Sequence, residues 1–396
     1  MDITQLLAFT MQNDASDLHL SPSNPPIIRA YGDLKRVKVD PLESEDIRSM
    51  VYSVMTEDQR TEFERDMEID FSIALGDKAR FRVNCYTTRK GTAAVFRTIP
   101  SLIPTMEELE LPPVLRKFAE LEKGMVLIAG QTGSGKSTTL ASMINHINEH
   151  HAKHIVTIED PVEFFHTSKK SLVNHREVGT DTKSFARALK SALREDPDVI
   201  LVGEVRDYET MALALTAAET GHLVFGTVHA NTAPKTIDRI IDVFPSGDKD
   251  MARTMLSTSI QGVVQQNLLK RADGSGRVAA HEILVGTNAV RNLIRENQIS
   301  QLYSMLQTGM RYGMQTLEDA VNDLLAQSII SKAEARRVLS KASDEQAELE
   351  EDEGISSQGH QTDDADEDMH RSDPAANIGG GPSLDEVASD EEGYSF

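Results

Sequence analysis

A glycine-rich loop between an apolar segment and a helix-like segment constrains this chain more than any other feature. Residues 130–137 read Gly-Gln-Thr-Gly-Ser-Gly-Lys-Ser and match the phosphate-binding pattern G-x-x-x-x-G-K-[ST]. The preceding residues, 125–129, are apolar and predict a short buried strand, whereas 138–146 have the apolar spacing of a helix. This succession predicts an α/β fold in which backbone N–H groups and a helix N-terminus face a phosphate chain.

The pattern assigns a role to each part of the loop. Its glycines let the backbone curl, so that N–H groups converge on the phosphates. Lys136 is expected against the β- and γ-phosphates, and the Ser137 hydroxyl is expected to ligate Mg²⁺. The expected nucleotide-binding residues are Gly130, Gln131, Thr132, Gly133, Ser134, Gly135, Lys136, Ser137 and Thr138.

Polar residues follow three further apolar segments, 154–158, 198–203 and 222–228. In a parallel sheet such strand ends gather beside the phosphate loop. An ATPase needs an acidic group to hold Mg²⁺ and orient the attacking water, and Glu204 is the best candidate, with Glu163 second. Two simpler interpretations stay open: an acid at a helix N-terminus for Glu204, and a solvated surface charge for Glu163.

Residues 1–100 predict a separate small α/β domain, and a Pro-rich linker at 101–113 follows it. Its expected helices are Ile3–Met11 and Glu43–Phe63, and its expected strands are Asp17–Leu20, Ile27–Tyr31, Ile69–Ile73, Ala79–Tyr86 and Thr92–Ile99. The last two strands are expected to form an antiparallel hairpin, and a turn is expected at Gly32-Asp33. From about Val114, strands alternate with longer helices, which predicts a parallel sheet with crossover helices.

Composition bounds the remaining possibilities. The chain has 396 residues and a net charge of −22, but residues 343–396 contain 18 acidic residues and one arginine. The rest of the chain is only mildly acidic, which disfavours a nucleic-acid surface. The tail predicts disorder, and its role is left open between solubilisation and partner binding. The single Cys85, the lack of a signal peptide and the lack of an apolar run of membrane-spanning length indicate the cytoplasm.

Taken together, these segments resemble the secretion ATPases of the type IV pilus and type II secretion superfamily. Residues 130–137 resemble the Walker A loop of these ATPases, 158–163 the Asp box, 200–207 an atypical Walker B and 220–229 the His box. The chain is most similar to the pilus retraction ATPases, the PilT family, whose C-terminal signature it matches except at Val290. The matching residues are Ala289, Val290, Arg291, Asn292, Leu293, Ile294, Arg295 and Glu296.

The resemblance covers about residues 1–342. It implies a PAS-like N-terminal domain, a RecA-like domain at 114–342 with a C-terminal helical region, and a ring of six subunits that hydrolyses ATP with Mg²⁺. It also implies partners: the pilus platform protein of the inner membrane and a paralogous retraction ATPase. No nucleic-acid partner and no direct membrane insertion are implied. The implied location is the cytoplasmic side of the inner membrane, at the pilus base.

The resemblance also implies roles for individual residues. Glu204 would organise Mg²⁺ through water, and Glu163 would be the general base or share that role. His222 and His229 would couple the γ-phosphate to domain position, although each has a structural alternative as a hydrogen-bonding strand-end histidine. Arg82 and Arg97 would complete the site from the N-terminal domain, and ordinary exposed strand cations are the alternative.

Three other functions stay open at this point. One is a PilU-like accessory retraction ATPase, and a second is a pilus-assembly or type II secretion ATPase, or a DNA translocase with the same core. The absence of a four-cysteine metal loop and of excess basic charge argues against the second. The third is a non-enzymatic nucleotide-gated subunit, against which Lys136, Glu163 and Glu204 argue. The signature at 289–296 has its own alternative, an amphipathic surface helix.

Overall fold

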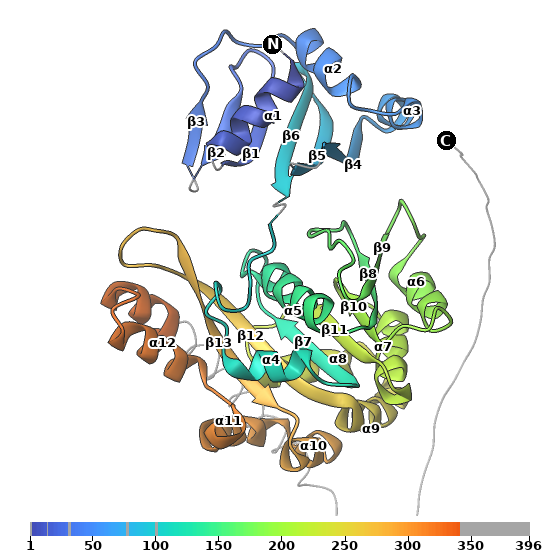
Figure 1. Ribbon diagram of the computed structural model, residues 1–396, viewed down its shortest axis with the longest axis vertical. Helices are drawn as coiled ribbons and strands as arrows, with labels where there is room; N and C mark the ends of the chain where they lie inside the picture. Colours follow the sequence, from blue (N-terminus) through green and yellow to red (C-terminus); the bar gives the residue numbers. More distant parts are fainter. Residues whose placement is uncertain (1, 14, 31–32, 77–78, 100–101, 341–396) are drawn as a thin grey trace, which may run out of the picture. The chain divides into compact units, whose positions relative to one another are not determined.

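Two β-sheets organise this protein in a computed structural model that describes residues 2–13, 15–30, 33–76, 79–99 and 102–340 (Figure 1). The acidic tail at 343–396 lies outside the described residues, as does Gly32 of the expected turn. Among the described residues, no helix combines the length and the apolar character that crossing a membrane would require.

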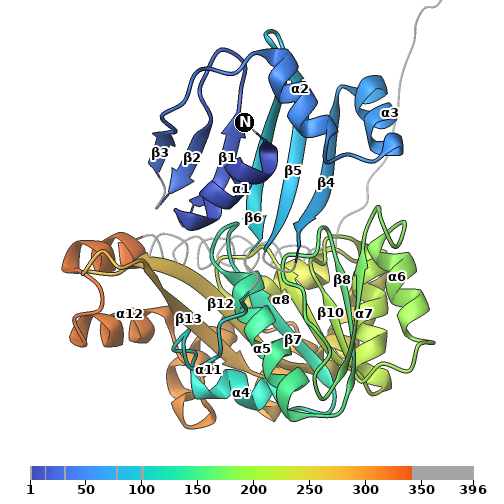
Figure 2. The same ribbon diagram turned by 45° about the horizontal axis from the view of Figure 1, so that its top comes forward.

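The N-terminal sheet is antiparallel throughout. Its strand order is β3 (Asp33–Arg36), β2 (Ile27–Ala30), β1 (Ala15–Leu20), β6 (Gly91–Ile99), β5 (Ala79–Thr88) and β4 (Glu68–Leu75). Helices α1 (Ile3–Gln12) and α2 (Ser44–Tyr52) lie over one face, and α3 (Glu57–Asp66) packs beside β4 (Figure 2). Phe81 and Phe96 are fully buried in the core between this face and the helices. The expected hairpin of β5 and β6 is confirmed.

Two expectations for this region were wrong. The single helix expected at Glu43–Phe63 is two helices, because Thr56 caps a new helix start and accepts a hydrogen bond from the backbone N–H of Gln59. Strand β3 was missed because all four of its residues are exposed, so it lacks the alternation that marks a half-buried strand.

The second sheet has seven strands. Their order is β13 (Arg277–Val285), β12 (Ile260–Lys270), β7 (Gly124–Ala129), β11 (Leu223–Val228), β10 (Val199–Val202), β8 (His154–Glu159) and β9 (Leu172–Glu177). All neighbours are parallel except β13, which runs antiparallel to β12. Every residue of β7, β10 and β11 is buried, as expected for parallel strands covered on both faces. The expected parallel sheet is confirmed, with one antiparallel edge strand added.

Helices cover both faces of this sheet. Helices α4 (Pro113–Ala119) and α5 (Lys136–His150) share one apolar core with alternate strand residues such as Val126 and Phe225. The opposite core contains Leu127 and Val224, and the helices of this layer are α6 (Phe185–Ala192), α7 (Tyr208–Thr220), α8 (Ala233–Asp242), α9 (Lys249–Ser259), α10 (Asn288–Arg295) and α11 (Leu302–Thr308). Helix α12 (Leu317–Ala326) packs separately against β13.

Candidate active site

The phosphate loop joins the carboxyl end of β7 to the first turn of α5. The helix begins at Lys136, two residues earlier than expected, so Lys136 and Ser137 both belong to its first turn. Gly135 is the N-cap residue, and its φ of +89° favours glycine at this position. Gly130 also needs to be glycine, because a Cβ there would lie 2.6 Å from the backbone oxygen of Gln266. The loop is therefore shaped by its neighbour β12 as well as by its own sequence.

Lys136 is buried at the base of this loop. Its Nζ donates hydrogen bonds to the carbonyl oxygens of Gly130, at 2.8 Å, and Gln131, at 3.0 Å. Burial lowers the pKa of Lys136, and the nearby carboxylates of Glu204 and Glu163 partly oppose that shift. The structure thus brings both candidate acids within electrostatic range of the loop lysine.

Sequence analysis missed Gln266, which ties the loop to β12. The buried Gln266 side chain donates from Nε2 to the carbonyl oxygen of Ser134, and its Oε1 accepts from the Thr139 hydroxyl, both at 2.8 Å. His281 Nε2 lies 3.2 Å from the same Oε1. Burial lowers the pKa of His281 to about 4, so the ring is neutral at pH 7 and can donate this hydrogen bond. Two adjacent glutamines in an apolar run, Gln265 and Gln266, were the available signal.

Glu204 follows β10 after one intervening residue, Gly203, and faces His229, which directly follows β11. The distance from His229 Nε2 to Glu204 Oε1 is 3.0 Å, and Arg206 pairs with the same carboxylate. Burial alone would raise the pKa of Glu204. The hydrogen bond from Arg206 and the charges of His229 and Lys136 outweigh burial, so the pKa of Glu204 is lowered. Glu204 is therefore an ionised carboxylate at neutral pH.

Glu163 follows β8 and is exposed. Its backbone N–H lies 3.4 Å from a side-chain oxygen of Glu159, the last residue of β8. Glu159, which sequence analysis did not single out, is a buried carboxyl group. Burial raises its pKa to about 7, and the negative charges of Glu163 and Glu177 act in the same direction. A buried carboxyl group with a raised pKa, Glu159, and an exposed one, Glu163, therefore lie four residues apart.

The raised pKa of Glu159 predicts that the stability of the folded protein depends on pH through this residue. Because the folded-state pKa lies above the unfolded value, its stabilising contribution is complete below about pH 4.5 and is lost as the pH rises through about 7. Glu159→Gln removes the titration. The melting temperature of the wild type minus that of the variant should therefore decrease steadily from pH 5 to 8. A difference that stays constant over this range would contradict the assignment.

The two expected histidines lie at opposite ends of the same central strand, β11. Leu223 pairs with Gly124 and Val228 with Ala129, so β11 carries His222 at its amino end and His229 at its carboxyl end. His222 Nδ1 lies 2.9 Å from the carbonyl oxygen of Ala217 and so closes the end of α7. The role implied beside the γ-phosphate thus suits His229. The expectation for His222 is corrected. His222 precedes β11, whereas the phosphate loop follows the parallel strand β7, so His222 and the phosphate loop of the same chain lie at opposite ends of the strands.

Arg82 and Arg97 are directly opposite each other in the hairpin of β5 and β6. They lie on the face away from the buried core, where Arg97 pairs with Asp17 at 2.9 Å and Arg82 with Asp70 at 3.6 Å. Like charges directly opposite each other destabilise a sheet, and the two carboxylates offset that repulsion. Arg97 has a structural role as well, because the Asp17 carboxylate that it pairs with is buried.

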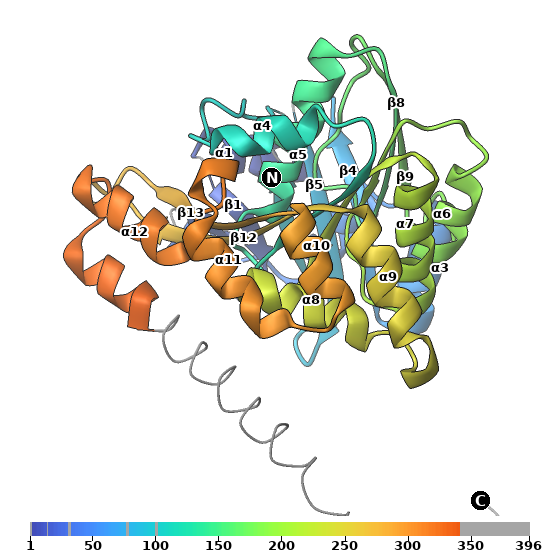
Figure 3. The ribbon, with the colours of Figure 1, turned by 90° about the horizontal axis from the view of Figure 1, so that it is seen from below.

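The expected signature at 289–296 forms most of α10, which packs beside α9 (Figure 3). Val290 and Ile294 are buried, as an amphipathic helix requires. Arg291 has a structural role, since its guanidinium donates to the carbonyl oxygens of Gly286 and Thr258 and to Gln261 Oε1. The exposed residues of the signature are Ala289, Asn292, Arg295 and Glu296.

A cavity of about 200 Å³ opens beside the phosphate loop. Loop residues from Gln131 to Ser134 line one side, and β12, β13 and the segment near Arg337 line the other. The Ser134 hydroxyl oxygen is buried and has no hydrogen-bond partner within the described residues. A polar cavity with an unpaired buried hydroxyl at a helix N-terminus suits a bound phosphate chain.

Known proteins resemble this chain over nearly all its described length. A model of the type II/IV secretion system protein family matches residues 1–337. The type IV pilus retraction ATPase PilT of Pseudomonas aeruginosa is 55% identical over 336 residues, which cover 85% of this chain and 97% of PilT. The type IV pilus ATPase PilU of the same organism is 39% identical over 344 residues, which cover 87% of this chain and 90% of PilU.

Solved structures agree with the sequences. A crystal structure of the pilus retraction motor PilT with bound ADP matches this fold with a TM-score of 0.80 at 45% identity, covering 85% of this chain and 97% of that one. The higher identity to PilT than to PilU favours the retraction motor over the accessory ATPase. The chain therefore belongs to the type II/IV secretion system protein family and, within it, to the PilT-type pilus retraction ATPases.

Proposed function

We propose that this protein hydrolyses ATP with Mg²⁺, as a ring of six subunits, to power the retraction of a type IV pilus. The observation that supports the chemistry best is the ionised Glu204, which contacts His229 and acts electrostatically on Lys136 at the carboxyl edge of one sheet. The family membership supports the retraction.

The residues present fit a nucleotide and a divalent cation. Loop N–H groups, the α5 N-terminus and the buried Lys136 suit the phosphates, and the Ser137 hydroxyl with the Glu204 carboxylate suits Mg²⁺ and its waters. Bound Mg²⁺ would supply charge neutralisation on the phosphate oxygens. These assignments extend to this chain the ADP that is bound in the PilT crystal structure.

The side chains divide the chemistry among them. Lys136 exchanges its loop carbonyl partners for phosphate oxygens, which carry more negative charge. Glu204, kept ionised by Arg206 and His229, orients water. Glu163, exposed near the loop, accepts the proton of the attacking water or shares that role with Glu204. His229 connects Glu204 to the end of β11.

We further propose that residues 1–100 and 114–342 are separate domains, each with its own core. Arg82 and Arg97 are proposed to act on nucleotide from the N-terminal domain, because two cations lie directly opposite each other on the face of the sheet away from its core. The proposed partners are five further copies of this chain, the pilus platform protein of the inner membrane and a paralogous retraction ATPase. The proposed location is the cytoplasmic side of the membrane at the pilus base.

Deletion of the gene and imaging of pili test the retraction function. Cells without the protein should carry excess pili that do not retract, and the wild-type gene should restore retraction. Bald cells after deletion would indicate an assembly motor instead.

The signature helix α10 offers a test that separates retraction from ATP chemistry. A double variant Asn292→Ala/Arg295→Ala changes only exposed residues and should keep its melting temperature and ATPase rate while losing pilus retraction. Arg291→Ala, by contrast, removes three hydrogen bonds and should lower the free energy of unfolding by about 1–3 kcal/mol. Thermal unfolding, ATPase assays and pilus imaging on both variants make the comparison. Loss of ATPase activity in the exposed pair would assign the helix a purely structural role.

A further inference from the structure

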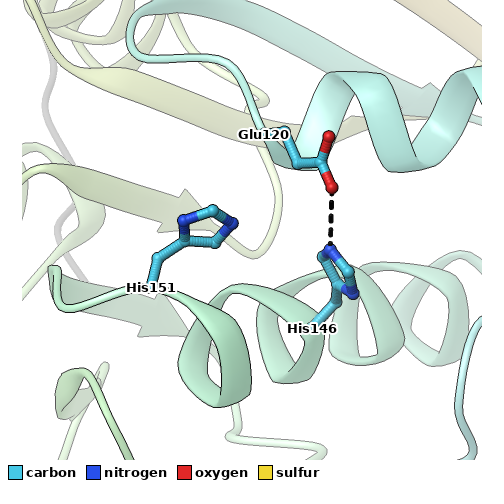
Figure 4. A group of neighbouring side chains, drawn as sticks. All are labelled: Glu120, His146 and His151. Atoms are coloured by element: carbon cyan, nitrogen blue, oxygen red, sulfur yellow. Dashed lines mark hydrogen bonds and ion pairs between the residues drawn. The ribbon is translucent and has the colours of Figure 1, made fainter.

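A second polar cluster lies at the far end of α5 from the phosphate loop. Glu120 ends α4, His146 lies in the last third of α5, and His151 directly follows that helix. Each offers one ligand atom, and these three atoms lie within 4.8 Å of one another (Figure 4). Ten residues of helix separate His146 from Lys136, or about 15 Å, so the cluster is distinct from the nucleotide site.

The positions of these side chains are fixed by the fold. The backbone of His151 is held at both polar atoms, because its N–H donates to the Ile147 carbonyl at 2.8 Å and its oxygen accepts from the Ser171 hydroxyl at 2.6 Å. The His146 ring stacks on His150, with centroids 4.4 Å apart, and its Nε2 lies 3.4 Å from Glu120 Oε1. Two imidazoles and one carboxylate therefore converge from two helix ends.

The local electrostatics favour a cation here. Helices α4 and α5 both end at the cluster, and the carbonyl groups at a helix C-terminus carry partial negative charge. The nearby positive charge of Arg116 is engaged by Glu107.

A neighbouring cavity of about 230 Å³ borders only His146 among the three residues of the cluster. Glu120 is exposed to solvent, so water can reach the cluster and complete a coordination sphere.

We propose that Glu120, His146 and His151 bind one Zn²⁺ ion, with water as the fourth ligand. Two histidines and one glutamate form an established ligand set for zinc, whereas Mg²⁺ prefers oxygen ligands. Tetrahedral bonds of about 2 Å place ligand atoms roughly 3.3 Å apart, so the side chains must close by about 1–1.5 Å. Glu120, whose side chain is 47% exposed, is free to make that movement. The bound ion joins the end of α4 to the end of α5.

Zinc titration of the metal-free full-length protein tests the proposal. Competition with a chromophoric chelator should show a site that His151→Gln and Glu120→Gln each weaken by more than about tenfold. His154→Gln removes a histidine outside the cluster and should leave the affinity unchanged, so it controls for binding elsewhere, including the acidic tail. A thousandfold excess of Mg²⁺ should not compete.

Thermal unfolding gives an independent readout. Saturating Zn²⁺ should raise the melting temperature of the wild type by several degrees, and that of His151→Gln much less. Both cluster variants change partly exposed residues, so they avoid the packing loss expected for His146→Ala. Equal zinc affinity in wild type and His151→Gln, or no difference in thermal shift between them, would overturn the proposal.

Discussion

Purified Glu204→Gln protein should lose ATP hydrolysis by about 10²–10⁴-fold while it still binds ATP. The substitution keeps the size of the side chain but removes its negative charge. In the wild type, the hydrogen bond from Arg206 and the charges of His229 and Lys136 keep the Glu204 carboxyl group ionised. An amide cannot take a proton and holds Mg²⁺-bound water less strongly. Phosphate release measures the rate, and a fluorescent ATP analogue measures binding.

Glu209→Gln is the matched control for this variant. Glu209 is exposed in the first turn of α7, five residues along the chain, and belongs to no part of the proposed site. Its ATPase rate should equal that of the wild type. Wild-type turnover in Glu204→Gln itself would remove Glu204 from the mechanism and leave Glu163 as the acid to test.

Lys136→Met should abolish productive nucleotide binding, with a loss of roughly 10²–10³-fold in hydrolysis. The expected effect on the stability of the nucleotide-free protein, by contrast, is small. Burial disfavours the charged lysine, but methionine also gives up two hydrogen bonds to loop carbonyls, so the melting temperature of the nucleotide-free protein should change little. Addition of ATP or ADP with Mg²⁺ should raise the melting temperature of the wild type but not of the variant.

Lys190→Ala, on the exposed side of α6, controls for the loss of a positive charge. It should retain both hydrolysis and the thermal shift with nucleotide. A normal thermal shift with nucleotide in Lys136→Met would show that the ammonium group does not contact phosphate.

The phosphate loop and the acids near it were predictable because their signals are local. An apolar run that ends in Glu204 needs no knowledge of distant residues, and strand direction alone places that end beside the loop. The same rule, applied strictly, separates His229 from His222, since only His229 follows its strand. The family resemblance had grouped the two histidines, and the sheet geometry divides them.

Other features depend on partners that no local pattern connects. Gln266 reaches Ser134 across 132 positions of sequence, only because β12 is hydrogen-bonded to β7 in one register. The raised pKa of Glu159 comes from burial, which a strand-end glutamate does not reveal. The break at Thr56 was readable, because a threonine followed three residues later by glutamine is a capping box.

Strand β12 contacts both the signature helix and the phosphate loop through side-chain hydrogen bonds. Near its start, Gln261 accepts a hydrogen bond from Arg291 of the signature helix, and five residues later Gln266 contacts the phosphate loop. Five residues of extended chain span about 17 Å. Hydrogen bonds to β7 and β13 on either side prevent this length from bending freely. Strand β12 is thus a stiff element that connects the signature helix α10 to the phosphate loop.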